Sequence, residues 1–432
     1  MALIHSRDYP RPPELLAVSF AFPPLALPRS IQVARLLKHL PTSTVLVCCD
    51  QEEGIRKDST IEPDAEPKLR KCLRVPFSHT GWGRLANKVA HRLELPLWNK
   101  SPDQYVSWKG PVLRAIDQYA RSENYAPDSL VTFGYPMSDH LVGLELKKVF
   151  GVPWIAHFSD PWVGNIYTEV GHDRWTDARN RALERKVAET ADRLIFTSQE
   201  TVDMVMAKYS PEIRAKARVL PQSFDTASFA ALQHEKNGLI IRHTGWFYGP
   251  RTPRPLFNAL SAILSSSPAL LAGVKLELIG DIDPKTIAES GLETLPADLI
   301  SIKAPVDYSE SLRLIAASDG LFLIDAPAEK SVFLPSKLVD YMGAGRPILG
   351  LTPPGAARSL IEQLGGWVAS PDNLEEMTRS LHSFLSYLQE HKNAQREFWG
   401  DQKTREQYEA AVVAQTFAEI LDELLPSSRL QQ

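Results

Sequence analysis

The sequence predicts an α/β protein with two parallel, doubly wound sheets, and three observations carry that prediction. Short uncharged runs, typical of strands buried on both faces, alternate with longer amphipathic segments along most of the chain. This alternation stops near residue 226 and begins again at Leu239. The chain has 432 residues, which fits two or three domains of about 100–200 residues each. We therefore expect two parallel-sheet units in series.

The first unit is expected to begin with a strand over Leu15–Phe22, a continuous apolar run that a pair of prolines ends. A helix over Ser30–Leu40, with Ser30 as its N-cap, and a strand over Thr44–Cys49 follow. This strand–helix–strand order implies a parallel pair joined by a right-handed crossover. The alternation continues with strands over Ser129–Tyr135, Val152–Phe158 and Arg193–Ser198, helices over Ser138–Phe150 and Trp175–Ala191, and a short strand with an exit loop over Ala217–Asp225.

The second unit repeats the alternation and ends in a long helical tail. Strands are expected over Leu239–Gly245, Val274–Asp281, Ile300–Ile302, Gly320–Asp325 and Pro347–Leu351, and helices over Pro255–Leu264, Ser309–Ser318 and Ser336–Gly343. The stretch from about 372 to 425 has helical character throughout. No internal repeat interrupts this order, and no strand is expected in the tail.

Composition limits the class of protein. Hydrophobic residues make up 44% of the chain and charged residues 23%, the profile of a globular protein rather than a disordered one. The formal net charge of −4 gives no overall basic footprint for nucleic acid. Cys48, Cys49 and Cys72 offer neither a disulfide framework nor zinc spacing, which favours a reducing compartment. The sequence has no signal-peptide pattern and no run of about 18 apolar residues, so a cytoplasmic protein is expected.

Ligands of open α/β sheets bind beyond the carboxyl ends of the strands, and two expected strand ends of the first unit carry polar side chains. Arg29 closes the proline-rich loop Phe22–Ser30 just before a helix. The segment HFSDPW places His157, Ser159 and Asp160 at the mouth of another strand. Each feature also has an ordinary structural explanation, namely a solvated arginine at a packed corner and an aspartate that favours the turn before proline.

In the second unit, the segment that follows the strand at Leu239 has the pattern of an anion site. Gly245 permits a close backbone approach, and Arg251 supplies a bidentate donor just before a helix. The N-terminus of that helix favours negative charge. The alternative explanation is a basic loop in solvent.

The helix after Ala326–Pro335 is the most informative of these segments. Pro335 is expected at its first position, where a missing N–H costs nothing. Ser336, Lys337 and Asp340 share one arc of the helix. A phosphate near the hydroxyl and the ammonium, and a sugar hydroxyl near the carboxylate, would both be satisfied there. The alternative is an ordinary amphipathic helix with a solvated face.

Together these segments resemble the retaining glycosyltransferases of the family 4 type, which have the GT-B fold. The resemblance covers roughly residues 15 to 370, and the motifs occur in the order of that family. The segments that carry it are FAFPPLALPRS, LVTFGYPMSDHLVGLELKK, VPWIAHFSDPW, VLPQSFD, TGWFYGPR and VFLPSKLVDYMGAGRPIL.

The resemblance implies two Rossmann-like domains facing across a cleft, with a C-terminal helix that crosses back to the first domain. Residues 1–225 would bind the acceptor, 226–405 would bind a nucleotide-diphosphate sugar, and 406–432 would form the returning helix. The reaction it implies is transfer of a hexosyl group to an acceptor hydroxyl with retention, without a metal or another cofactor. Surface-polysaccharide or glycolipid assembly, with a sugar or a lipid-linked acceptor, is the expected setting.

The resemblance also assigns roles to residues. Asp160, Arg251 and Lys337 would be catalytic, and the two basic residues would stabilise the leaving diphosphate. Arg29, His157 and Ser159 would lie on the acceptor side. The donor-binding set would comprise Gly245, Arg251, Glu329, Lys330, Ser336, Lys337 and Asp340.

Several positions depart from the family pattern. Val332 stands where the family has the first Glu of a Glu-x7-Glu pair, with Glu329 and Lys330 just upstream. Trp246 replaces a basic residue, Ser159 replaces an arginine, and the exit motif has Gln-Ser for Asn-Gly. These changes leave two alternatives open: a nucleotide-sugar epimerase of GT-B fold, and a catalytically inactive GT-B-like partner protein.

A basic segment with interleaved aromatic residues spans residues 68–100 and holds eight Lys or Arg against one Glu. Its part GRLANKVAHRL has the pattern of a short basic amphipathic helix. Such a segment binds anionic lipid at about 1 kcal/mol per well-placed charge, which would make the protein peripheral at the cytoplasmic membrane face. The alternative is a solvated run of charges.

Overall fold

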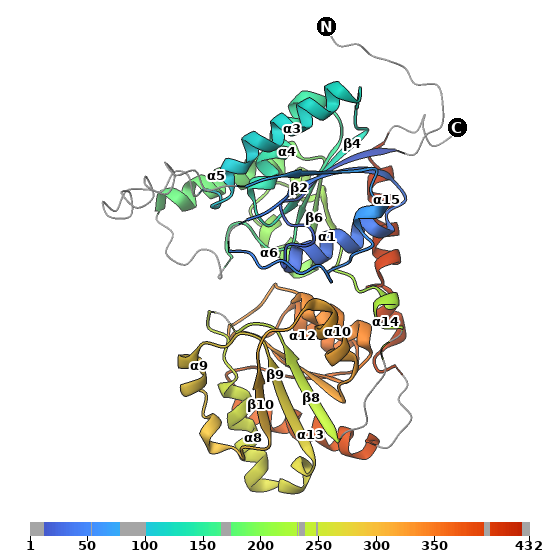
Figure 1. Ribbon diagram of the computed structural model, residues 1–432. Helices are drawn as coiled ribbons and strands as arrows, with labels where there is room; N and C mark the ends of the chain where they lie inside the picture. Colours follow the sequence, from blue (N-terminus) through green and yellow to red (C-terminus); the bar gives the residue numbers. More distant parts are fainter. Residues whose placement is uncertain are drawn as a thin grey trace. The chain divides into compact units, whose positions relative to one another are not determined.

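The computed structural model describes residues 13–52, 54–77, 101–165, 174–230, 232, 238–247, 249–392 and 398–425. The chain divides into two compact units (Figure 1). The first comprises the chain up to Phe196, Val205–Leu220 and the chain from Ala414, and the second comprises Thr197–Met204 and Pro221–Val413. None of the helices in the described part is both long and apolar enough to cross a membrane.

The first unit contains a seven-stranded parallel sheet in the order β3-β2-β1-β4-β5-β6-β7. The strands are β1 (Glu14–Val18), β2 (Ser43–Cys49), β3 (Lys71–Val75), β4 (Ser129–Gly134), β5 (Trp154–Phe158), β6 (Arg193–Phe196) and β7 (Ala217–Val219). The inner strands β1, β4 and β5 are buried along their whole length, as continuous apolar runs require.

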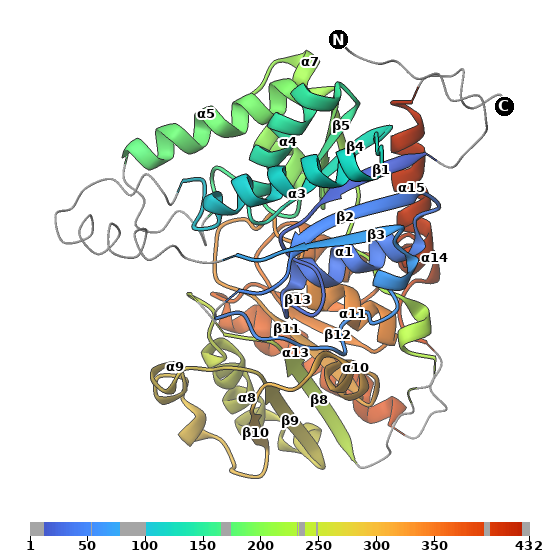
Figure 2. The ribbon, with the colours of Figure 1, turned by 45° about the horizontal axis from the view of Figure 1, so that its top comes forward.

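Helices cover both faces of this sheet. In Figures 1 and 2, α3, α4 and α5 lie on one face, and α1 lies on the other with α15 beside it. The helix bounds are α1 (Pro28–His39), α3 (Lys109–Ser122), α4 (Ser138–Phe150), α5 (Arg174–Thr190), α6 (Gln199–Met206), α7 (Pro211–Arg214) and α15 (Ala410–Asp422). Two helices, α6 and α15, run across the division between the units.

The second unit contains a six-stranded parallel sheet in the order β10-β9-β8-β11-β12-β13. Its strands are β8 (Leu239–Thr244), β9 (Val274–Ile279), β10 (Ile300–Lys303), β11 (Gly320–Ile324), β12 (Ile348–Leu351) and β13 (Trp367–Ala369). Its helices are α8 (Arg254–Ser266), α9 (Pro284–Ala288), α10 (Tyr308–Ala316), α11 (Ser336–Ala344), α12 (Ala356–Gln363), α13 (Leu374–His391) and α14 (Gln402–Glu406).

Two apolar clusters sandwich the second sheet, because successive strand residues point to opposite faces. Phe322 and Ile324 of β11 pack with residues of α8 and α13, while Leu321 and Leu323 pack with residues of α10, α11 and α12. Both sheets are doubly wound, so each has a point where the strand order reverses. These switch points lie between β1 and β4 in the first unit and between β8 and β11 in the second.

The expected α/β architecture with two doubly wound parallel sheets is confirmed, and several expected elements need correction. The first strand ends at Val18 instead of Phe22, and α1 starts at Pro28, so Ser30 lies inside that helix rather than at its N-cap. The strand at Lys71–Val75, within the basic segment, was not expected. Residues 78–100, including the expected amphipathic helix, lie outside the described residues.

The C-terminal tail is not one continuous run of helix. Asp401 accepts a hydrogen bond from the backbone N–H of Thr404 and so caps a new short helix, α14. The last helix, α15, then belongs mainly to the first unit, where Glu423 just beyond it pairs with Arg193 and Arg218.

Candidate functional site

The switch point of the second unit is an opening between two strand ends. The pairing of β8 with β11 stops at Leu321 and Arg242, although both strands continue. The side chain of His243 occupies the opening, with its Nδ1 2.9 Å from the carbonyl oxygen of Phe322. The hydroxyl of Tyr341 donates to the same carbonyl at 3.2 Å. It also accepts from the backbone N–H of Thr244 at 3.0 Å, so the separated strand ends keep their hydrogen bonds.

Gly245 and Lys337 meet at the mouth of this opening. Gly245 has φ +121°, a conformation that side chains rarely tolerate. A Cβ on Gly245 would lie 2.6 Å from Nζ of Lys337. The ammonium therefore rests directly against the backbone of the strand end, 3.2 Å from Nε2 of His243.

Arg251 is held in a buried ion pair. Its Nε and Nη2 donate to Oδ1 of Asp325, at 3.1 and 2.8 Å, at the end of β11. The two side chains are 6% and 1% exposed. The same carboxylate oxygen accepts the backbone N–H of Ala326 at 2.9 Å. The sequence identified Arg251 as a donor but not the partner that fixes its guanidinium.

Burial determines the protonation states of Lys337 and His243. Desolvation lowers the pKa of Lys337 to about 7, and the positive charge of Arg251 lowers it further while Asp325 acts in the opposite sense. The pKa of His243 is held well below its usual value by burial and then by the charge of Lys337. At neutral pH the site therefore holds a neutral imidazole, a charged guanidinium and an ammonium near its titration midpoint.

The start of α11 differs in detail from the expectation. Pro335 is the N-cap, in extended conformation, and the helix begins at Ser336, with no side-chain hydrogen bond at the cap. Leu338 and Met342 are buried as expected. Asp340 is also buried and accepts a hydrogen bond from the hydroxyl of Tyr308 at 3.0 Å, so it is an engaged carboxylate rather than one on a solvated face.

The loop before α11 is anchored through its carbonyls. Ser198 and Thr201 both donate to the carbonyl oxygen of Val332, at 3.0 and 3.1 Å. The side-chain amide of Gln222, from the exit motif, donates to the carbonyl of Leu334 at 3.0 Å. The position of the family's first Glu therefore contributes a backbone contact here. Glu329 and Lys330, just upstream of Val332, are exposed, and Trp246 is 57% exposed.

The switch point of the first unit gathers a second polar cluster. Oδ2 of Asp139, in the first turn of α4, accepts the backbone N–H of Phe20 at 2.7 Å, just after β1. Nη2 of Arg29, in the first turn of α1, lies 3.0 Å from Nδ1 of His157 and donates to its carbonyl at 2.8 Å. Next to Asp139, the imidazole of His140 lies 2.8 Å from the hydroxyl of Thr132.

The predicted residues Ser159 and Asp160 complete this cluster. The Ser159 hydroxyl lies 3.2 Å from Oδ2 of Asp160. Burial raises the pKa of Asp160 and lowers that of Arg29 to about 9, and the two groups attract each other. Burial also raises the pKa of Asp139 well above its usual range and lowers that of His140 to about 3.

The structure thus sorts the predicted residues into two groups, one in each unit. Arg29, His157, Ser159 and Asp160 come together in the first unit. Gly245, Arg251 and Lys337, with Ser336 as the neighbour of Lys337, come together in the second. Glu329 and Lys330 lie on an exposed loop. Sequence reasoning missed Asp139, His140, His243, Asp325 and Tyr341. Asp139, His140 and Tyr341 lie in quoted motifs, and His243 and Asp325 lie in predicted strands.

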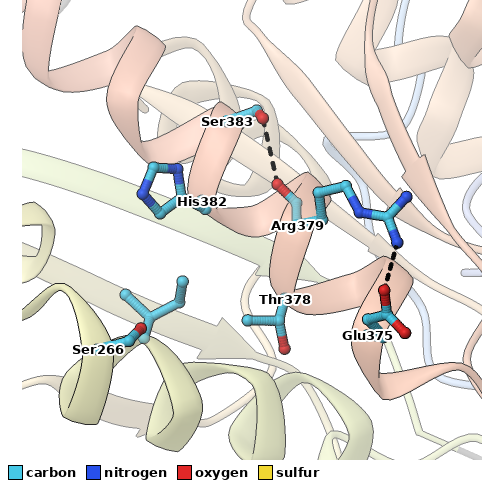
Figure 3. Close-up of a pocket in the computed structure, with 7 residues that line it drawn as sticks. Ser266, Glu375, Thr378, Arg379, His382 and Ser383 are labelled. Carbon is cyan, nitrogen blue, oxygen red and sulfur yellow. Dashed lines mark hydrogen bonds and ion pairs between the residues drawn. The ribbon is translucent and has the colours of Figure 1, made fainter.

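In the described part of the chain, neither a metal site nor the surface pocket of the second unit involves the predicted residues. Within the described ranges, no group of three His, Cys, Asp or Glu side chains is placed to hold a metal ion. A surface pocket lies between α8 and α13, where Arg379 pairs with Glu375 beside His382 (Figure 3). It contains none of the predicted site residues.

No family model and no curated protein matches the chain. Solved structures do. The sucrose-phosphate synthase of Thermosynechococcus elongatus matches with TM-score 0.64 and 14% identity, over 95% of this chain and 99% of that chain. HepE of Anabaena, in complex with UDP-glucose, matches with TM-score 0.60 and 15% identity, over 95% and 100%. A putative UDP-N-acetylglucosamine 2-epimerase of Listeria monocytogenes matches with TM-score 0.56 and 15% identity, over 95% and 96%.

These likenesses establish the fold. Each of the three matches extends over 95% of this chain and almost the whole of the other, so both units and their connection are included. The two-domain GT-B fold expected from the sequence is therefore confirmed.

Proposed function

We propose that this protein is a glycosyltransferase that moves a sugar from a nucleoside-diphosphate sugar to an acceptor hydroxyl. The observation that carries the proposal is the basic group at the switch point of the second unit, where Lys337 rests on Gly245 beside Arg251. In doubly wound sheets this is the place where nucleotides bind. Two buried cations there would stabilise the negative charge of a leaving diphosphate.

UDP is the nucleotide that we propose for the donor. HepE was crystallised with UDP-glucose and with UDP, and the similar sucrose-phosphate synthase carries the name of a sugar-transferring enzyme. In this chain, Gly245 would let the diphosphate approach the backbone, and the first turn of α11 at Ser336 would face it. Asp340, held by Tyr308, and the exposed Glu329 and Lys330 remain our candidates for further donor contacts.

The acceptor side of the proposal rests on the first unit. Asp160 is our candidate catalytic carboxylate, and Arg29, His157 and Ser159 are candidates for orienting the acceptor. Retention at the anomeric carbon, membership of the family 4 type, and a role without a metal or other cofactor belong to the same proposal. So do a hexosyl donor, a sugar or lipid-linked acceptor, and a peripheral contact of residues 68–100 with anionic membrane.

The first experiment measures nucleotide binding by the full chain. We expect UDP to raise the melting temperature, because a ligand at 100 times its Kd stabilises a protein by about 2.7 kcal/mol. Lys337→Met and Arg251→Ala should lose the shift, and Lys285→Met, at an exposed ion pair of the same unit, should keep it. Release of UDP from UDP-glucose, with NMR of the product anomer, then tests transfer and retention. A protein that binds no nucleotide under these conditions would contradict the proposal and support the inactive partner protein.

An epimerase is the second candidate, because a putative UDP-N-acetylglucosamine 2-epimerase has the same fold and an epimerase needs acid–base groups. The first unit supplies carboxylates at Asp139 and Asp160 and imidazoles at His140 and His157. Incubation with UDP-N-acetylglucosamine separates the two functions. Appearance of the 2-epimer without UDP release would favour the epimerase, and UDP release without epimer would favour the transferase.

A further inference from the structure

Lys337 is a buried ammonium with an unusual set of neighbours. The residue as a whole is partly exposed, and desolvation at the β8–β11 opening is the largest cause of its lowered pKa. Its Nζ lies against Gly245, and its hydrogen-bond partner is Nε2 of His243 at 3.2 Å. Among the residues that the structure describes, no carboxylate oxygen forms an ion pair with it. A buried charge without an ion-pair partner is costly to keep.

The hydrogen bonds of His243 fix which nitrogen carries its proton. Nδ1 lies 2.9 Å from the carbonyl oxygen of Phe322, and a carbonyl oxygen can only accept. Nδ1 therefore carries the hydrogen, and Nε2 presents a lone pair to Lys337. The ring is fully buried and packs 4.8 Å from the ring of Phe247, centroid to centroid. His243 thus holds the ammonium at one place without neutralising it.

The charged and titratable groups around Lys337 come from each element of the site. Arg251 lowers the pKa of Lys337, and Asp325, which is bonded to Arg251, raises it. His243 of β8 is kept neutral by burial. On α11 itself, Asp340 is bonded to Tyr308, and burial raises the pKa of Tyr341 to about 12. Among these described groups, the ammonium of Lys337 is the one whose charge changes near neutral pH.

We propose that Lys337 takes up a proton when a nucleoside diphosphate binds at this opening, and that His243 is the positioning residue that holds Lys337 for that contact. The inference rests on the proposed function, because it names how the donor site is regulated. The anionic diphosphate would supply the counter-charge that the free site does not place next to Nζ. The lone pair of Nζ takes the proton from an acid in solvent, so one N–H bond forms as the bond between that acid and its proton breaks, and no bond between heavier atoms changes.

The titration of Lys337 determines how many protons are taken up on binding and how the Kd for UDP changes with pH. Its pKa of about 7 in the free protein leaves the amine mostly neutral at pH 8 and mostly charged at pH 6. Binding at pH 8 should therefore take up about 0.9 proton, and binding at pH 7 about 0.5. Above pH 8 the Kd for UDP should rise about tenfold per pH unit. The phosphates of UDP contribute nothing at pH 8, because the second ionisation of a phosphate lies near pH 6.

Isothermal titration calorimetry of the full chain with UDP tests the proposal. Heats measured at pH 8 in buffers of different ionisation enthalpy give the number of protons taken up. We expect about 0.9 for the wild type and for Lys285→Arg, an exposed lysine of the same unit. We expect an uptake of less than 0.2 proton for Lys337→Arg, whose guanidinium stays charged at pH 8.

The role of His243 is tested by affinity. His243→Phe keeps an aromatic ring but removes both nitrogens, and should raise the Kd for UDP at pH 6.5 at least tenfold. His243→Gln should recover part of the affinity.

The outcomes separate this inference from the proposed function. If the wild-type protein binds UDP at pH 8 but takes up fewer than about 0.2 proton per UDP, the proton linkage is wrong and nucleotide binding stands. If His243→Phe binds UDP like the wild type, its positioning role is wrong. If UDP fails to bind at every pH between 6 and 9, the proposed function fails and the inference falls with it. The wild-type measurement decides the linkage even if a variant does not fold.

Discussion

Gly245 is the residue where backbone conformation and binding chemistry meet. Gly245→Ala would place a methyl group 2.6 Å from Nζ of Lys337 at φ +121°, so the ammonium must move. We expect at least a tenfold loss of UDP affinity and a stability loss of about 1–3 kcal/mol. Gly273→Ala is the matched control, since Gly273 also has a positive φ, +73°, but open space around its Cβ. Calorimetry measures the affinity for UDP, and urea unfolding measures the stability. Equal UDP affinity of the two variants would contradict the placement of Gly245 in the binding site.

The ion pair of Arg251 with Asp325 makes a separate prediction about stability. Asp325→Ala removes the carboxylate that accepts both guanidinium hydrogen bonds in a pair that is almost fully buried. Loss of one partner of such a pair costs about 3–5 kcal/mol. Glu375→Ala breaks an exposed pair with Arg379 and should change the free energy of unfolding by about 0.5 kcal/mol or less. Equal losses in the free energy of unfolding for the two variants would show that burial does not determine how much the ion pair stabilises the protein.

At the scale of elements, the last helix is expected to stabilise the first unit. Phe417 of α15 is fully buried, and Phe417→Ala should reduce the free energy of unfolding by about 3–5 kcal/mol. Glu423, which is 45% exposed and pairs with Arg193 and Arg218, provides the control. Glu423→Ala should cost less than about 1 kcal/mol. The test is urea unfolding of the full chain, and similar costs for both variants would argue against a packed helix.

Elements could be predicted from sequence where burial leaves a local signature. The inner strands β1, β4 and β5 are covered on both faces and have continuous apolar runs, so they were found. The edge strand β3 has one neighbour and carries charged side chains at Lys71 and Arg74, so its pattern is that of a surface segment. The break in the tail depends on a single capping side chain, Asp401.

The candidate site was predictable in part for a related reason. Chemistry at strand ends can be found locally, because the sheet brings those ends to one edge, and Gly245, Arg251, Lys337 and Asp160 were found that way. Their partners could not be found, since Arg251 and Asp325 are 74 positions apart and His243 and Lys337 are 94 apart. Such pairs follow from the order of strands in the sheet rather than from any spacing along the chain.

The whole molecule should lose stability in mild acid. Burial holds the pKa values of His140, His157 and His243 below the unfolded value of about 6.5. Below pH 6.5 the unfolded chain binds protons that the folded chain does not, which costs up to about 1.4 kcal/mol per pH unit for each histidine. The raised pKa values of Asp103, Asp139 and Asp160 act in the opposite sense. We expect a net loss of about 1–3 kcal/mol between pH 6.5 and 5.

Urea unfolding at pH 7.5, 6.5 and 5 measures this dependence. His243→Phe should make the acid slope shallower, and His382→Gln, at an exposed position of α13, should leave it unchanged. An acid slope that His243→Phe leaves unchanged would show that the imidazole of His243 is not held neutral in the folded protein.

The separated ends of β8 and β11 have a consequence for how a ligand would enter. The carbonyl of Phe322 and the N–H of Thr244 are already occupied by His243 and Tyr341, so the two strands cannot pair any further. The conformational entropy of ordering these two strand ends is lost when the chain folds, before any nucleotide binds. Preorganisation of this kind lowers the ordering cost of association. The strand ends of the second unit are therefore already in place before a ligand binds. Differences in affinity among nucleotides should come from direct contacts rather than from rearrangement of the sheet.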